Sequence, residues 1–202
     1  MPDPFFTANR DLFQACLEHP FVQGIARGTL RPGQFAGYVA QDAWFLGAFA
    51  RAYASALART TDDRDLWLFK KLLDGVVTEL ELHRGYAARW GIDLGRVEPM
   101  PATLAYTDFL AGVAGREPIP QIVAAMAPCM RLYAWLGQSL SPVADPASPT
   151  IEWVRTYADP AFAALADEVD GLLAGPGADP ARQAWLYRRA MQLEYGFFDA
   201  HR

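Results

Sequence analysis

Apolar residues recur at intervals of three and four along nearly the whole chain, and this periodicity constrains its fold more than any other feature. Such spacing places apolar side chains on one face of an α-helix. Runs of alternating apolar and polar residues, typical of half-buried strands, are nearly absent, and β-branched residues are sparse. The pattern therefore predicts an all-α protein.

Clusters of proline and glycine divide the chain into seven or eight helices with short connections. Pro32 suits the first turn of a helix, because its missing N–H has no intrahelical partner there. No internal repeat or long polar linker interrupts the pattern, so residues 1–202 are expected to form a single-domain helical bundle. The predicted helices cover 5–18, 19–28, 32–59, 63–90, a segment after EPMPAT to about 115, one after REPIPQ to about 140, 149–174 and 180–201.

The charge balance argues against nucleic acid and anionic membrane surfaces as partners. The net charge is −5, and 18 basic residues lie scattered among 23 acidic ones rather than clustered. No apolar run approaches the roughly 20 residues needed to cross a bilayer, and MPDPFFTANRD lacks the pattern of a signal peptide. The two cysteines, Cys16 and Cys129, do not resemble a disulfide framework, so we expect free thiols in a reducing, cytoplasmic environment.

Two carboxylates fall on or beside apolar helix faces. Asp42 interrupts a stripe that includes Tyr38 and Phe45, and a buried carboxylate is costly unless it is paired or hydrogen-bonded. A structural hydrogen bond to a neighbouring helix is the alternative to a functional role. Glu194 lies at the margin of a stripe that includes Phe197, where the alternative is a side chain that reaches solvent.

A thiol and a phenol share a buried face in the segment MAPCMRLYAWLG. Cys129 and Tyr133 are four residues apart, on a stripe with Met126. Pro128 removes one backbone hydrogen bond just before the cysteine and is expected to bend the helix there. The alternative for Cys129 is a small buried hydrophobe, the role expected of Cys16.

Tyr106 and Tyr157 also align with apolar faces, although a single core tyrosine usually makes one hydrogen bond and has no further role. Taken together, two acids, a thiol and three phenols on five predicted helices point toward the interior. Polar groups that converge in an apolar, aromatic-lined pocket are typical of a small-molecule site.

A metal site is not favoured by the sequence. Glu79 and His83 in TELELHRGY have the i, i+4 spacing of metal ligands, but a di-iron bundle needs about four carboxylates and two histidines in matched motifs. The chain has three histidines and no second Glu/His repeat, and no HExxH, phosphate loop or GxSxG motif appears. We expect Glu79 and His83 to form a local pair or to pack between helices.

Seven segments resemble, in order, the TenA/thiaminase II family. They run from about residue 11 to about residue 200: HPFVQGIARGTL, YVAQDAWFLGAFARAYA, ELELHRGYAARWGI, PATLAYTDFL, APCMRLYAWLGQSL, IEWVRTYADPAF and LEYGFFDA. The resemblance implies an all-α, haem-oxygenase-like fold without haem or other cofactor, usually assembled as a homotetramer.

The resemblance also implies an activity: hydrolysis of thiamin or its breakdown product, an aminomethylpyrimidine, to hydroxymethylpyrimidine. The family's nucleophilic cysteine maps onto Cys129 and its C-terminal glutamate onto Glu194. The remaining site residues map onto Asp42, Tyr106, Tyr133 and Tyr157. Family members can carry a tyrosine three residues after the aspartate. This chain has Phe45 at that position, which retains the aromatic ring for stacking but lacks the hydroxyl that could form a hydrogen bond.

The hypothetical mechanism is covalent. A Cys129 thiolate adds to C6 of the pyrimidine, the ring expels the leaving group, and water adds to the exposed methylene. Asp42 would bind the amino-pyrimidine edge, and Glu194 would hold a ring nitrogen and serve as acid/base. The alternatives are a non-catalytic pyrimidine-binding or regulatory protein, and a haem-oxygenase-like di-iron oxidase.

Overall fold

The computed structural model describes residues 4–31, 33–89 and 91–202, and within them every regular element is a helix. The all-α prediction is confirmed. In these described ranges there are ten α-helices and two short 3-10 helices, rather than seven or eight helices. The α-helices are α1 Pro4–Ala8, α2 Arg10–Leu17, α3 Pro20–Arg27, α4 Gln34–Arg59, α5 Asp63–Arg89, α6 Pro101–Arg116, α7 Ile119–Leu140, α8 Ile151–Ala158, α9 Pro160–Asp170 and α10 Pro180–Asp199.

Two of the predicted helices are broken by residues that form local hydrogen bonds. Asn9 separates α1 from α2, and its side-chain Nδ2 donates to the carbonyl oxygen of Phe5 at 2.8 Å. Asp159 separates α8 from α9, because its carboxylate accepts the N–H of Ala161 at 2.8 Å and Pro160 occupies the first turn of the next helix. Pro32 and Trp90, predicted helix ends, lie outside the described residues.

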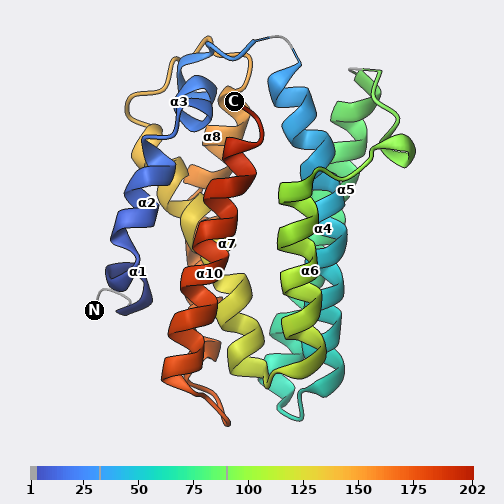
Figure 1. The fold of residues 1–202 in the computed structure, drawn as a ribbon, viewed down its shortest axis with the longest axis vertical. Coiled ribbons are helices and arrows are strands. Elements are labelled where there is room, and N and C mark those ends of the chain that lie inside the picture. Colours follow the sequence, from blue (N-terminus) through green and yellow to red (C-terminus); the bar gives the residue numbers. More distant parts are fainter. Residues whose placement is uncertain (1–3, 32, 90) are drawn as a thin grey trace.

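The helices pack in two groups that enclose the interior. α4 packs against α5 and α6, and α7 packs against α8, α9 and α10. Figure 1 shows α4, α5 and α6 standing together beside α7 and α10, with α1 to α3 along the opposite side. α7 is almost wholly buried and continues through Pro128. In the part of the chain that the structure describes, no helix combines the length and apolarity needed to cross a membrane.

Gly137 lets α8 approach α7 closely. A Cβ atom at this position would lie 2.3 Å from the carbonyl carbon of Tyr157 and 2.4 Å from the nitrogen of Ala158. Any side chain here would therefore force the two helices apart. The absence of a side chain at Gly137 fixes where the backbone of Tyr157 lies.

Candidate functional site

The polar groups predicted to face the interior do so. Five of their side chains are buried, and Cys129 is half-buried. The exposed fraction of Glu194 is only 2%, so the alternative of an edge glutamate in solvent is wrong. The five buried residues are Asp42, Tyr106, Tyr133, Tyr157 and Glu194.

Glu194 on α10 joins residues from two other helices. The hydroxyl of Tyr106 on α6 donates to its Oε1 at 2.7 Å, and the Cys129 thiol on α7 lies near enough to the carboxyl to lower its pKa. Burial raises the pKa of Glu194 to about 7, although Tyr106 and Cys129 act in the opposite direction. A carboxyl with this pKa can both take and return a proton near neutral pH.

Cys129 is held as a thiol rather than as a thiolate. Burial raises its pKa well above the ordinary value, and the negative charges of Glu194, Asp42 and Glu79 raise it further. The groups that act on this thiol are therefore carboxyls, and a positive field is not among them. Cys16, by contrast, is completely buried in the core, as predicted.

Asp42 is partnered by a residue whose role was not foreseen. Nε2 of His83 on α5 lies 2.7 Å from Oδ2 of Asp42, and Nδ1 of the same ring lies 2.9 Å from the carbonyl oxygen of Glu79. The aspartate therefore has the hydrogen bond to a neighbouring helix that burial requires. Hydrogen bonding and the Asp42 charge outweigh burial and raise the pKa of His83 to about 9, so the ring is an imidazolium at neutral pH.

Glu79 does not form the expected local side-chain pair with His83. Its carboxyl instead accepts the hydroxyl of Tyr157 on α8, with 2.9 Å between the oxygens. Burial, together with the charge of Asp42, raises the pKa of Glu79 to about 7. The sequence carries a signal for this arrangement, because His83 lies seven residues after Val76 on the same apolar helix face. A polar ring on an apolar face needs hydrogen-bond partners inside the bundle.

Aromatic rings form the walls between these polar groups. Phe45 packs against Tyr106 with 4.7 Å between ring centroids, and Tyr133 meets Tyr157 edge-on at 4.8 Å. The hydroxyls of Tyr133 and Tyr38 lie 2.9 Å apart. Tyr38 was recognised only as a core residue, yet it extends the phenol network. These faces suit a flat, planar ligand.

Asp42, Glu79 and His83 also form the kind of cluster that ligates metals. One potential ligand atom from each lies within 4.8 Å of the others. One imidazole and two carboxylates from two helices would hold a single divalent ion. This set is smaller than the two histidines and about four carboxylates of a di-iron centre, so it does not favour the di-iron oxidase.

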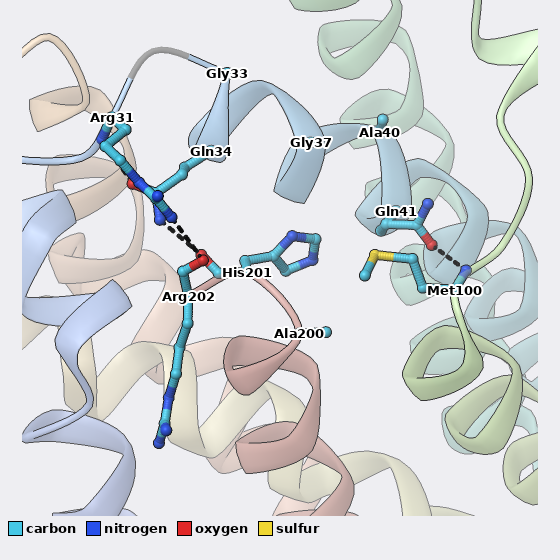
Figure 2. A pocket seen from close by; sticks show the side chains of 10 residues that line it. All are labelled: Arg31, Gly33, Gln34, Gly37, Ala40, Gln41, Met100, Ala200, His201 and Arg202. Carbon is cyan, nitrogen blue, oxygen red and sulfur yellow. Dashed lines mark hydrogen bonds between the residues drawn. The ribbon is translucent and has the colours of Figure 1, made fainter.

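A separate hollow of about 510 Å³ opens between the first turns of α4 and the end of α10. Figure 2 shows the ring of His201 reaching into it below Gly37, opposite Gln41 and Met100. The interior polar groups do not line this hollow. The His201 ring instead packs against Tyr38 and Phe197 at 5.7 and 5.6 Å between ring centroids. This aromatic layer lies beside the hollow. The volume of the hollow is therefore no evidence for a ligand site at the Cys129 thiol.

A helical bundle in which a thiol, carboxyls and phenols converge inside aromatic walls is typical of proteins with an interior small-molecule site. The chain belongs to the TENA/THI-4/PQQC family, whose sequence model matches residues 7–200. It is similar to an aminopyrimidine aminohydrolase of Halalkalibacterium halodurans, with 32% identity over 93% of this chain and 89% of that protein. The resemblance to the TenA family is thereby confirmed.

Solved structures agree with this placement. A protein of a Silicibacter species, described as a TenA family transcription regulator, has a TM-score of 0.89 and 26% identity, covering 98% of this chain and 94% of that one. A Shewanella denitrificans domain with a haem-oxygenase-like fold has a TM-score of 0.71 at 14% identity, covering 96% and 88%. The predicted haem-oxygenase-like fold is confirmed.

Proposed function

We propose that this protein hydrolyses 4-amino-2-methylpyrimidines at the exocyclic methylene on C5 and releases hydroxymethylpyrimidine. Substrates of this class are the aminomethylpyrimidine formed when thiamin breaks down and thiamin itself, which places the reaction in thiamin salvage. The observation that carries the proposal is the placement of the Cys129 thiol beside the buried Glu194 carboxyl, an arrangement that suits a nucleophile and its base.

The ring is held by its edge and by its faces. Asp42, held in place by its 2.7 Å interaction with His83, accepts hydrogen bonds from the amino edge of the pyrimidine. Phe45 and Tyr133 offer aromatic faces on α4 and α7. Tyr106 orients Glu194 through its 2.7 Å hydrogen bond. This arrangement presents C6 of the ring to the sulfur of Cys129.

The order of the reaction steps follows from the protonation of the Cys129 thiol. The Cys129 proton passes to the Glu194 carboxylate as Sγ forms a bond to C6, because the raised pKa of the cysteine leaves little free thiolate. The electron-rich ring expels the leaving group, and the departing amine of aminomethylpyrimidine takes the proton from Glu194. Glu194 next deprotonates the water that adds to the methylene. It returns this proton to Sγ as the sulfur leaves C6, which restores both the thiol and the aromatic ring.

The Cys129→Ser variant tests the assignment. Incubated with aminomethylpyrimidine and followed by chromatography of the product, it should form hydroxymethylpyrimidine at least about 100-fold more slowly than the wild type. It should still bind hydroxymethylpyrimidine. Turnover close to that of the wild type would exclude Cys129 as the nucleophile.

A regulatory, non-catalytic role is the second candidate, favoured by the description of the Silicibacter relative as a transcription regulator. The thiol–carboxyl contact argues against it, because ligand binding alone does not require a nucleophile beside a base. Tight binding of hydroxymethylpyrimidine by wild-type protein that turns over no aminopyrimidine would support the regulator.

The proposal also covers the oligomeric state of the protein and its location in the cell. Three tryptophans expose large apolar surfaces, with exposed fractions of 45% for Trp44, 66% for Trp67 and 55% for Trp185. Aromatic side chains are enriched at contacts between protein chains, and the family resemblance implies a homotetramer. Light scattering on the purified protein tests the stoichiometry. The free thiols fit a reducing cytoplasm.

A further inference from the structure

The residues proposed to act on the pyrimidine lie inside the bundle, so a substrate needs a way in. The exposed fractions of Glu194, Tyr133 and Asp42 are only 2%, 5% and 6%. The hollow of about 510 Å³ beside α4 and α10 opens at the surface but is not lined by these groups. A route from this hollow to the interior would supply the access that burial otherwise denies.

Two of the helices that border the hollow also carry site residues a short distance further in. Gln41 lines the hollow, and Asp42 follows it directly on α4, with Phe45 one turn further along. His201 also lines the hollow and lies just past the end of α10, seven residues after Glu194. At a rise of about 1.5 Å per residue, these spacings put the hollow about one to two helical turns from the proposed site residues.

The imidazole of His201 connects the hollow with the aromatic walls of the site. Figure 2 shows this ring reaching into the hollow. The same ring meets Tyr38 edge-on at 5.7 Å and Phe197 at 5.6 Å between centroids. Both partners continue inward, because the hydroxyls of Tyr38 and Tyr133 lie 2.9 Å apart and Phe197 packs on Phe45 at 6.1 Å. His201 is therefore the outermost ring of an aromatic layer between the hollow and the site.

The His201 ring is enclosed but not hydrogen-bonded through Nε2. The residue is 7% exposed, and this buried nitrogen has no hydrogen-bond partner among the residues that the structure describes. A buried polar atom without a partner destabilises the arrangement that buries it. Burial also lowers the pKa of the ring to about 4, against the effect of the Asp42 charge, so the ring is neutral and has no ionic attachment to the interior. Turning toward the hollow would let water bond Nε2.

The backbone around His201 is anchored, so that only its side chain has to move. The carbonyl oxygen of His201 accepts a hydrogen bond from Nε2 of Gln34 at 3.0 Å, and its N–H donates to the carbonyl oxygen of Phe198 at 3.0 Å. Arg31 donates to the carbonyl oxygen of Arg202 at 2.9 Å. These bonds hold the segment after α10 against the start of α4 and leave the imidazole free to rotate about its own side-chain bonds.

We propose that the hollow is the entrance to the interior site and that the ring of His201 is its gate. The ligand that passes, a flat aminopyrimidine, rests on the proposed function. In the closed arrangement the ring covers Tyr38 and Phe197. When it turns into the hollow, the way toward Cys129 opens, and when it returns, the ligand is enclosed between aromatic walls. His201 touches no reacting atom and acts on entry alone.

The first test measures how fast iodoacetamide reaches Cys129 in the native protein at one fixed pH. His201→Ala removes the gate but keeps the anchoring bonds of this residue, which come from its backbone. It should label Cys129 about tenfold faster than the wild type, because a closed state no longer competes with the open one. Cys16 reports on the integrity of the fold, since it is completely buried in the core, and should stay unlabelled in both proteins.

Gly37→Trp tests the hollow in the opposite direction. Gly37 lines the hollow, and a Cβ added there meets no atom within 4 Å, so an indole can fill the space without displacing the backbone. Labelling of Cys129 and kcat/KM for aminomethylpyrimidine should each fall about tenfold, with a smaller change in kcat. Gly75→Trp is the matched control, because Gly75 is exposed on α5 and equally free of neighbours. It should keep the wild-type values.

A wild-type rate of Cys129 labelling in either His201→Ala or Gly37→Trp would overturn the entrance. Faster labelling of Cys16 together with Cys129 in His201→Ala would indicate a loosened fold and would overturn the gate. Alkylation requires no turnover, so these results do not depend on the hydrolase assignment. Failure of that assignment is recognised separately, by absence of aminopyrimidine turnover in the wild type.

Discussion

Nε2 of His83 lies 2.7 Å from Oδ2 of Asp42, while the other ring nitrogen lies 2.9 Å from the carbonyl oxygen of Glu79. Both nitrogens face acceptors, so the ring donates on both sides only when it carries two protons. The pair is buried, with exposed side-chain fractions of 9% and 8%. The imidazolium thus fixes the orientation of the Asp42 side chain that is proposed to bind the pyrimidine.

The His83 interaction predicts a pH dependence of stability. The pKa of this histidine rises from an ordinary 6.5 to about 9 on folding, so its stabilising contribution is complete below pH 6.5 and is lost as the pH rises through about 9. The free energy of unfolding of the wild type should exceed that of His83→Gln by an amount that shrinks by on the order of 3 kcal/mol between pH 6 and pH 10. Urea titrations at the two pH values measure it, and an equal difference at both would contradict the ion pair.

Tyr106→Phe should move the pH dependence of catalysis. The hydroxyl that donates to Glu194 lowers the pKa of that carboxyl, so its removal should raise the pKa above about 7. The ascending limb of kcat/KM is then expected at higher pH, and Glu194→Gln should abolish that limb. Tyr195→Phe, whose hydroxyl bonds Arg202 at the surface, serves as control. An unmoved limb in Tyr106→Phe would remove Glu194 as the titrating base.

The two thiols should differ in alkylation. Cys129 is half-buried and Cys16 is completely buried, so native protein treated with iodoacetamide should gain one adduct per chain, located at Cys129 by peptide mass. Because burial raises the pKa of Cys129, labelling should accelerate with pH up to 9. Hydroxymethylpyrimidine should slow it. Equal labelling of both cysteines would contradict the packing around Cys16.

Gly137→Ala should destabilise the protein. The new methyl group would meet the backbone of α8, at 2.3 Å from Tyr157, and overpacking of this kind costs about 1–3 kcal/mol. Gly75→Ala is the control, because an added Cβ there meets no atom within 4 Å, and alanine favours an exposed helix by about 1 kcal/mol. Thermal unfolding should show a lower Tm for the first and a higher Tm for the second. A Tm of Gly137→Ala at or above that of the wild type would contradict the close approach.

The sequence predicted the helices well where a continuous apolar stripe determines the helix. It predicted the helix ends less well where a single residue determines them. The long helices α4 to α7 and α10 agree with prediction because their apolar stripes are continuous. The break at Asn9 was missed because it depends on a side chain that bonds nearby backbone, which periodicity does not record. The single-domain organisation stays a prediction.

The candidate site was predictable only in part for a related reason. Helical periodicity shows which polar residues fall on or beside an apolar helix face, and it identified Asp42 and Glu194 in this way. It does not identify partners on other helices, so the bonds from His83 to Asp42 and from Tyr157 to Glu79 appeared only in three dimensions. The proposed roles of the site residues remain predictions that the variants above test.

The groups around the thiol come from helices distributed along the chain, and Glu194 lies on α10, the last helix that the structure describes. A ribosome completes α7, with its cysteine, well before it makes this glutamate. The nascent polypeptide therefore carries Cys129 without the neighbouring carboxyl until α10 has been made. On the proposed mechanism the thiol gains its base only at that point, which spares the growing protein from side reactions of an activated sulfur.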